Sequence, residues 1–338
     1  MSVLGFVRPD GVEEAIAAVA GDPTAAYLAG GTTQVDLLLK DGVIAADRLV
    51  DISRLPMRGI TRLDGTIHVG ALTTMEELAA DPTVSERLPF VREALLAGAS
   101  TQLRNMATIG GNLLQRTRCR YFRDPTVAAC NKRRPGSGCA AISGAARMHA
   151  ILGTSAHCIA LHASDLCVPL VALNTVVQTR GPAGVRSIPL TDLYLLPGTT
   201  PDRETVLAHG ELITGIEVPL LPASARSGYL KVRDRASYEF ALTSAGVALV
   251  IADGMVVEAR VALGGVGTVP WRARNAEAVL HGAPARTETF RTAAEVALDG
   301  ASTVEGTAFK VELAKRTLAR ILQTVAGAGA GGAVGTQP

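Results

Sequence analysis

The cysteines are the residues of this sequence that most clearly could carry chemistry. All five lie between Cys119 and Cys167 of the 338-residue chain. An odd number of cysteines in a large chain without a secretion signal argues against a disulfide framework and favours metal binding or redox chemistry. We therefore expect a metal or redox site in this segment.

Four of these cysteines could supply the thiolates of one site. They are Cys119, Cys130, Cys139 and Cys158. Their spacing matches neither zinc fingers nor the closely spaced ligands of ferredoxins, so spacing alone identifies no metal. Four thiolates suffice for tetrahedral zinc or for a 4Fe-4S cluster, and buried free thiols are the alternative. The histidines His149, His157 and His162 could also complete a mixed zinc site. Cys167 stands in an apolar run and is expected in the core.

Seven basic residues surround the first two cysteines, with little more than Asp124 opposed to them. They are Arg116, Arg118, Arg120, Arg123, Lys132, Arg133 and Arg134. Such charge would offset the thiolates of a cluster and favour an added electron. A solvated basic loop and a docking surface for an acidic partner are equally open alternatives.

Two double-glycine turns are candidates for phosphate binding. One is Ala29-Gly30-Gly31-Thr32-Thr33, after an expected strand, and the other is Thr108-Ile109-Gly110-Gly111-Asn112. Glycine lets backbone N–H groups approach a pyrophosphate closely, and the neighbouring hydroxyls add donors. Neither turn fits the glycine fingerprint of Rossmann dehydrogenases or the P-loop of NTPases, which disfavours both classes. The alternative is two ordinary tight turns.

Two further side chains have both a structural and a cofactor interpretation. Ser164-Asp165 precedes an apolar run and could cap its first turn, or Asp165 could contact a cofactor. Lys231 could be a surface strand residue, or a cation placed where a reduced flavin develops negative charge. The local sequence leaves these alternatives open.

Helices and strands alternate in the first hundred residues, where they must position the first turn. A strand over 25–29 leads into that turn, and Thr74 and Glu77 have the spacing of a capping box for a helix over 75–80. Further helices are expected over 34–40 and 90–98, and strands over 49–52 and 67–69. From about 114 to 160 the chain lacks periodicity, which is uncommon unless a function or a metal organises the segment.

The second half of the chain is organised differently. A run rich in proline, alanine and serine over 219–227 suggests a domain boundary. Strands are expected over 229–235, 245–252 and 256–263, the last two joined by the hairpin signal Asp253-Gly254. Helices follow over 287–298 and 307–325. The tail over 327–338, rich in glycine and alanine, is expected to be disordered.

Composition argues against several classes of partner. A formal net charge of +2 gives no reason to expect a nucleic acid. The N-terminus shows no basic segment followed by a long apolar run, so we expect no secretion signal. The most apolar stretch, 159–177, contains His162, Asp165 and Pro169 and is expected to be buried rather than to span a membrane.

In their order along the chain, these motifs resemble the FAD-binding subunits of the xanthine dehydrogenase and carbon monoxide dehydrogenase group. The matching pieces are Ala29-Gly30-Gly31-Thr32, Asp51-Ile52-Ser53, Gln102-Leu103-Arg104-Asn105, Thr108-Ile109-Gly110-Gly111-Asn112, Ser164-Asp165, Tyr229 with Lys231-Val232-Arg233, and Leu263-Gly264-Gly265-Val266. The resemblance implies an α+β fold. A two-lobed FAD-binding domain of the vanillyl-alcohol-oxidase (PCMH) type would occupy 1–222, with the insertion over about 114–160. A smaller C-terminal α+β domain over 228–326 would pair a three-stranded sheet with helices.

The same resemblance implies roles for individual residues, with FAD extended between the two lobes. Expected around its pyrophosphate are Leu28, Ala29, Gly30, Gly31, Thr32, Thr33, Gln34, Thr108, Gly110, Gly111 and Asn112. Asp165 is expected to contact the cofactor, and Tyr229 and Lys231 are expected to approach the isoalloxazine.

The cysteine insertion most closely resembles that of the flavin subunit of bacterial periplasmic aldehyde oxidoreductases of the three-subunit type. The similarity includes Cys119-Arg120-Tyr121-Phe122, Cys130-Asn131-Lys132-Arg133 and Gly136-Ser137-Gly138-Cys139. It implies a 4Fe-4S cluster with Cys119, Cys130, Cys139 and Cys158 as ligands, and it leaves Cys167 free.

The role implied by the resemblance is electron transfer within a complex. Complexes of the family oxidise substrate at a molybdenum cofactor in a large subunit and pass electrons through 2Fe-2S clusters in a small subunit to FAD. This chain would then need both partners and an external electron acceptor, and would hold no catalytic residue. Its compartment would be the cytoplasm, or the periplasm by co-export with a partner. The rival interpretations are a zinc-stabilised binding module and a self-contained flavin oxidase of the same fold.

Overall fold

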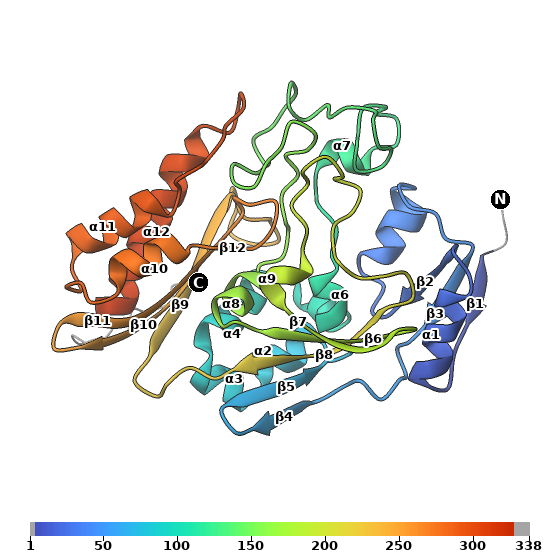
Figure 1. Ribbon diagram of the computed structural model, residues 1–338, viewed down its shortest axis with the longest axis horizontal. Coiled ribbons are helices and arrows are strands. Elements are labelled where there is room, and N and C mark those ends of the chain that lie inside the picture. The colour runs from blue at the N-terminus through green and yellow to red at the C-terminus, as the bar shows by residue number, and fades with distance from the viewer. Residues whose placement is uncertain (1–3, 328–338) are drawn as a thin grey trace.

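The structure is a computed structural model that describes residues 4–327 (Figure 1). Within these residues the strands form three sheets, of three, five and four strands. No helix in this range is both long enough and apolar enough to cross a membrane. The tail predicted to be disordered lies outside the described residues, except for Gly327, which ends the last helix.

The N-terminal lobe is a parallel sheet with one helix against it. Its strands are β1 Gly5–Val7, β2 Ala25–Leu28 and β3 Arg48–Asp51, in the order β1-β3-β2. Helix α1, Val12–Ala20, packs Ile16 and Val19 against Val50 because its apolar residues recur at helical spacing. As predicted, β2 leads directly into the first glycine turn. The π-helix η1, Asp36–Lys40, then lies within the range predicted to be helical.

The second lobe is built on an antiparallel five-stranded sheet. Strands β4 Ile60–Leu63, β5 Thr66–Gly70, β6 Val176–Gly181, β7 Gly184–Pro189 and β8 Leu212–Pro219 lie in the order β4-β5-β8-β6-β7. The helices of this lobe are α2 Met75–Ala80, α3 Pro82–Arg87, α4 Pro89–Ala97, α5 Thr101–Arg104, α6 Ile109–Leu113, α8 Cys167–Ala172 and α9 Leu190–Leu193. Their buried side chains, among them Phe90 and Leu170, share one core with Ile67 and Ile216 of the sheet.

The insertion between α6 and α8 is mostly irregular, as its missing periodicity predicts. Helix α7, Arg120–Arg123, is a single short turn, and an isolated bridge joins Cys130 to Cys139. The backbone N–H groups of Ile151 and Leu152 both donate to the carbonyl oxygen of Val266, in the C-terminal lobe. The conformation of the insertion therefore depends on contacts with distant parts of the chain.

The C-terminal lobe is an antiparallel sheet flanked by three helices. Its strands are β9 Arg226–Val232, β10 Thr243–Ala252, β11 Met255–Gly264 and β12 Trp271–Arg272, in the order β12-β11-β10-β9, and its helices are α10 Arg274–Leu280, α11 Thr287–Val296 and α12 Phe309–Gly327. The three predicted strands are present, and β12 adds a two-residue fourth strand that is too short to leave a sequence pattern. Asp253 and Gly254 have φ of 50° and 76°, as the predicted two-residue hairpin requires.

A shared core crosses the predicted domain boundary. Val247 of β10 packs among residues of the C-terminal lobe, whereas its neighbour Ala248 belongs to the cluster that contains Phe90 and Leu170. Successive strand residues point to opposite faces of a sheet, so the C-terminal sheet packs α12 on one face and the second lobe on the other. The division of the chain near 222–228 stays a prediction.

The capping box at the start of α2 provides a test of local stability. Thr74 Oγ1 accepts a hydrogen bond from Glu77 N at 3.2 Å, and Glu77 Oε2 accepts one from Thr74 N at 2.8 Å. Replacing Thr74 with Ala removes the cap, and we expect the free energy of unfolding to fall by about 1 kcal/mol. Urea denaturation followed by circular dichroism measures this change. Thr74→Ser keeps the hydroxyl as a control, and an equal loss in both variants would contradict the capping explanation.

Candidate functional site

The two predicted phosphate-binding turns meet where the two lobes approach each other. A Cβ atom on Gly30 would come 1.8 Å from the carbonyl oxygen of Met106, in the segment that leads into the second turn. Only glycine allows this approach. Gly31 has φ +73°, in the left-handed region that glycine enters without steric cost. Glycines thus bring a turn of the N-terminal lobe against a turn of the second lobe.

Backbone N–H groups of the first turn are available to an anion. In the described range, no protein acceptor is found for the N–H groups of Gly31, Thr32 and Thr33. The second predicted turn is instead the start of helix α6, where Gly110 N donates to Ala71 O at 2.8 Å and Gly111 N donates to Oγ1 of the N-cap residue Thr108 at 3.2 Å. The first turn therefore offers most of the donors for a phosphate group.

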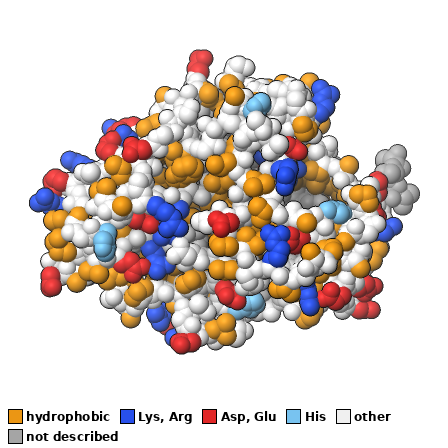
Figure 2. Space-filling view, viewed as in Figure 1, with side chains coloured by type: hydrophobic (Ala, Val, Ile, Leu, Met, Phe, Trp, Pro, Cys, Tyr) orange, Lys and Arg blue, Asp and Glu red, His pale blue; other side chains and the backbone are white. Residues whose placement is uncertain are grey.

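A cavity of about 850 Å³ opens beside these turns. Twelve of the fourteen predicted cofactor residues line it: Ala29, Gly30, Gly31, Thr32, Thr33, Gln34, Thr108, Gly110, Gly111, Asn112, Asp165 and Lys231. Leu28 and Tyr229 do not line it. The surface is hollowed beside the N-terminal lobe (Figure 2). A cavity of this size accommodates a large organic cofactor.

Asp165, which was predicted to contact the cofactor, forms one cluster with Tyr229 and Lys231, which were predicted to approach its isoalloxazine. Tyr229 Oη donates to Asp165 Oδ1 at 2.6 Å, and Lys231 Nζ lies 2.8 Å from Asp165 Oδ2. Lys231 Nζ also donates to the carbonyl oxygen of Ala97 at 3.1 Å. Burial raises the pKa of Tyr229, so its hydroxyl keeps the proton that it donates. Tyr229 therefore acts on the cavity through Asp165, which it holds in place.

Ser164 has the structural role that the sequence left open. Its Oγ accepts from Cys167 N at 3.1 Å, which caps α8, and donates to Asn112 Oδ1 at 2.5 Å. Cys167 is fully buried, with Sγ 3.1 Å from Tyr194 Oη, and burial raises the pKa of its thiol to about 11. The prediction that Cys167 is a core residue is confirmed.

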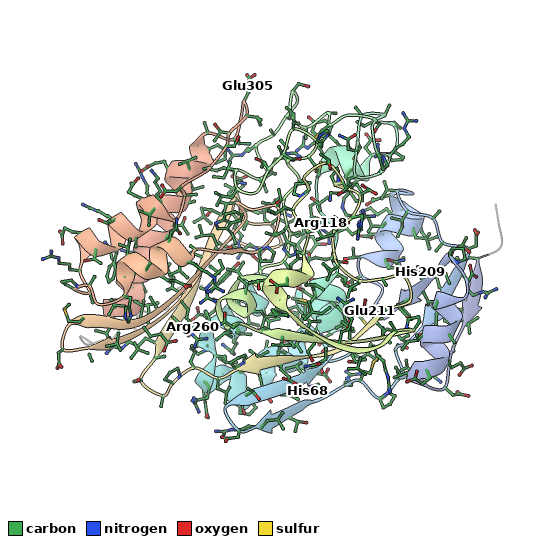
Figure 3. All side chains as sticks on the ribbon, in the orientation of Figure 1. His68, Arg118, His209, Glu211, Arg260 and Glu305 are labelled. Atoms are coloured by element: carbon green, nitrogen blue, oxygen red, sulfur yellow. The ribbon has the colours of Figure 1, made fainter. Side chains whose placement is uncertain are left out.

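Several cavity residues were not predicted as such, and Arg118 is one of them. Arg118 lines the large cavity, with its guanidinium carbon 4.9 Å from the centre of the Phe240 ring (Figure 3). Its Nε is buried without a partner in the described chain, and burial lowers the pKa of Arg118 to about 10. The sequence placed Arg118 in a basic loop, and no local signal distinguishes it from the other basic residues of that loop.

The four predicted ligand cysteines surround one small space in the insertion. Cys119, Cys130, Cys139 and Cys158 all line this space. Over residues 4–327, no group of three or more histidine, cysteine, aspartate or glutamate side chains is arranged to hold a single metal ion. Burial raises the pKa of Cys119 to about 11, so this thiol ionises only with a cation beside it.

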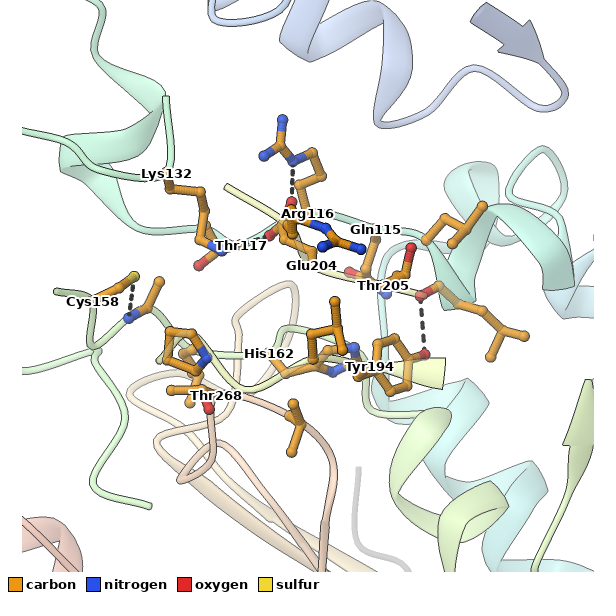
Figure 4. Close-up of a pocket in the computed structure, with 18 residues that line it drawn as sticks. Gln115, Arg116, Thr117, Lys132, Cys158, His162, Tyr194, Glu204, Thr205 and Thr268 are labelled. Carbon is orange, nitrogen blue, oxygen red and sulfur yellow. Dashed lines mark hydrogen bonds and ion pairs between the residues drawn. The ribbon is translucent and has the colours of Figure 1, made fainter. Parts of the chain in front are cut away.

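Three of the seven basic residues around the first two cysteines are paired with acids from distant segments. Arg116 and Lys132 both contact Glu204, with Lys132 Nζ 3.0 Å from Oε1 (Figure 4). Burial raises the pKa of Glu204, but Lys132 and Arg116 together hold it below its ordinary value. Arg123 lies 2.7 Å from Asp41 of the N-terminal lobe. Two acids far away in the sequence, Asp41 and Glu204, therefore oppose three of the seven basic residues.

The three histidines near the cysteines occupy different environments. His149 Nε2 lies 3.1 Å from Cys119 Sγ. His162 lines a separate cavity of about 50 Å³, next to the Arg116–Glu204 pair, and burial lowers its pKa to about 4 (Figure 4). His157 is exposed. The three do not converge on one site.

Comparison with known families shows which family the chain belongs to. Residues 2–221 match the family model described as the FAD binding domain in molybdopterin dehydrogenase, and residues 228–325 match the CO dehydrogenase flavoprotein C-terminal domain. This chain belongs to the FAD-binding subunits of the xanthine dehydrogenase family. It is therefore a flavoprotein and a subunit of an oxidoreductase.

Individual relatives resemble nearly the whole chain. The aldehyde oxidoreductase FAD-binding subunit PaoB of Escherichia coli (strain K12) is 46% identical over 325 residues, which is 95% of this chain and 98% of that protein. A carbon monoxide dehydrogenase structure from Hydrogenophaga pseudoflava, which lacks the Mo-pyranopterin moiety, superposes with a TM-score of 0.75 at 25% identity, covering 96% of this chain and 97% of that chain. A quinoline 2-oxidoreductase structure from Pseudomonas putida 86 superposes with a TM-score of 0.73 at 25% identity, covering 96% of this chain and 97% of that chain. The predicted fold class is confirmed.

Because the first glycine turn packs closely against the segment before the second, we expect a substitution of Gly30 to reduce FAD binding. In Gly30→Ala the new methyl group collides with the Met106 carbonyl, so the turns must separate and most of the bound FAD should be lost. Flavin released on denaturation, divided by the amount of chain, gives the occupancy. Gly11→Ala is the control, because a Cβ at Gly11 meets no atom within 4 Å. Full occupancy in Gly30→Ala would show that the close approach is unnecessary.

Proposed function

We propose that this chain is the FAD- and 4Fe-4S-binding electron-transfer subunit of a heterotrimeric, molybdenum-dependent aldehyde oxidoreductase. The observation that carries the proposal is the 46% identity to an aldehyde oxidoreductase FAD-binding subunit, over almost the whole of both chains. Carbon monoxide dehydrogenase and nicotine 6-hydroxylase medium subunits are related at only 26% and 25% identity. The proposal that the substrate is an aldehyde therefore depends on the similarity to the aldehyde oxidoreductase subunit PaoB.

The residues of the large cavity fit FAD. The free N–H groups of Gly31, Thr32 and Thr33 would hold its pyrophosphate, and the glycines of both turns keep this part of the cavity open. The Asp165–Lys231 ion pair presents one charge of each sign to the cavity. FAD would supply the transfer of electrons to an external acceptor, while these residues bind and orient it.

The chemistry of the insertion favours a cluster over its rivals. Four thiols line one space, and all-cysteine ligation is usual for a 4Fe-4S cluster. Cys119, Cys130, Cys139 and Cys158 would be its ligands. A single zinc ion would need ligands closer together than those in the described range.

The complex would contain two further subunits. Several relatives are named medium chains or medium subunits, which implies a larger and a smaller companion in those proteins. By analogy, a large molybdenum-cofactor subunit would oxidise the aldehyde, and a small 2Fe-2S subunit would pass the electrons to this chain. We propose export to the periplasm with a partner subunit, with a cytoplasmic complex as the alternative.

A visible spectrum of the purified chain tests both cofactors at once. Flavin bands together with a broad iron-sulfur shoulder are the expected result. A colourless protein would support the zinc-stabilised module instead. Flavin bands without the shoulder, together with oxidation of a substrate by the chain alone, would support a self-contained flavin oxidase.

Replacing Cys130 with Ser tests the cluster ligands. Three thiolates do not complete the ligand set, so we expect the complex to lose the iron and labile sulfide of one 4Fe-4S cluster and to keep its FAD. Iron, sulfide and flavin analyses measure this. Cys167→Ser should leave all three unchanged, because Cys167 lies in the core. Unchanged iron and sulfide in Cys130→Ser would refute the assignment.

Removal of FAD from the assembled complex tests the relay role. Turnover with the physiological acceptor should stop, because the proposed exit for electrons is gone, whereas one substrate-driven reduction of the molybdenum and 2Fe-2S centres should persist. Rapid-mixing spectroscopy separates these two phases. Sustained turnover without FAD would show that electrons leave the complex elsewhere.

A further inference from the structure

His149 is a buried side chain in direct contact with one proposed cluster ligand. Its Nε2 lies 3.1 Å from Cys119 Sγ, within hydrogen-bond distance for sulfur. The residue is 2% exposed, and its Nδ1 is buried without a partner in the described chain. Cys119 is therefore the only side-chain partner found for this ring in the described chain.

The chemistry of a ligated cysteine fixes the direction of this bond. A thiolate bound to iron has no proton to give and can only accept. The imidazole must then carry a proton on Nε2 in order to donate to this sulfur. The contact becomes an N–H···S hydrogen bond once the cluster is present.

The C-terminal lobe holds this histidine in position. Lys310, on α12, is fully buried, and its Nζ donates to the carbonyl oxygen of His149 at 2.8 Å. On the other side, Ala150 N donates to Ile159 O at 3.0 Å, next to Cys158. The ring is thus aimed at Cys119 by backbone contacts that do not involve a metal.

His149 does not have the position of a ligand. Four cysteines line a small space in the insertion. Neither His149 nor any other residue of the segment 143–156 lines this space. The ring approaches Cys119 from outside this space, and the four thiols already complete a ligand set.

We propose that His149 is a positioning residue that donates an N–H···S hydrogen bond to Cys119 and thereby raises the reduction potential of the cluster. Donation to a ligand sulfur withdraws electron density from it and stabilises the reduced, more negative state. The inference rests on the proposed 4Fe-4S cluster and adds a role for a residue outside its ligand set. It also gives the buried Lys310 a function, because Lys310 holds the backbone of His149.

The test uses the assembled complex and two substitutions of His149. Met has a similar size and no N–H donor, whereas the amide nitrogen of Gln can replace Nε2 as a donor. We expect His149→Met to keep its iron and labile sulfide but to show a lower midpoint potential in a redox titration followed by electron paramagnetic resonance. His149→Gln should recover most of the wild-type potential. His281→Met, which changes an exposed histidine of the C-terminal lobe with one backbone contact, is the control and should not shift it.

The outcomes separate this inference from the proposed function. A wild-type complex without a 4Fe-4S signal would refute the cluster itself. A cluster whose potential is the same in His149→Met and wild type would overturn only the role of His149. Loss of the cluster in both His149 variants, with FAD retained, would identify His149 as a ligand and overturn the inference as well.

A measurement on the wild-type complex covers the case in which the variants do not assemble. Histidine labelled with ¹⁵N should give a weak nitrogen coupling to the reduced cluster in pulsed electron paramagnetic resonance, as expected through a hydrogen bond. A strong coupling would show direct ligation, and no coupling would show that the bond is absent. Either result would overturn the proposal.

Discussion

The distance between the turn at Gly30 and the carbonyl of Met106 sets the geometry of the large cavity. The N-terminal lobe reaches the second lobe here and again near Gly210, where Tyr27 Oη donates to the carbonyl oxygen at 2.8 Å. His209, labelled in Figure 3, contacts the carbonyl oxygen of Val19 at 2.8 Å. With both regions in contact, the first turn and its free N–H groups are fixed relative to the Asp165–Lys231 pair.

The insertion has little core of its own and is held by all three lobes. Asp41 of the N-terminal lobe pairs with Arg123, Glu204 of the second lobe contacts Lys132, and Lys310 of the C-terminal lobe bonds the backbone of His149. Each contact ties a segment near a cysteine to a different packed element. The spacing of the four thiols therefore depends on the packing of the whole chain.

Features set by neighbouring residues could be predicted from the sequence, and features set by distant partners could not. The Thr74–Glu77 capping box, the Asp253-Gly254 hairpin and the turn after β2 each depend on a few adjacent residues, and all three are present. The contact of Lys231 with Asp165 joins residues 66 positions apart, and that of Arg116 with Glu204 joins residues 88 positions apart. No periodicity or spacing encodes such pairs. For the same reason the hydrogen bond of Tyr229 to Asp165 could not be predicted from the sequence.

The position of β8 in the middle of the second sheet has a consequence for the order of folding. β8 pairs with β5 on one side and β6 on the other, so the sheet stays incomplete until residue 219 has left the ribosome. Cys119, Cys130, Cys139 and Cys158 are all synthesised before that point. During this interval the sheet does not yet enclose the thiols, which are therefore accessible to oxidants. Any oxidation of these thiols would then precede the closure of the sheet by β8.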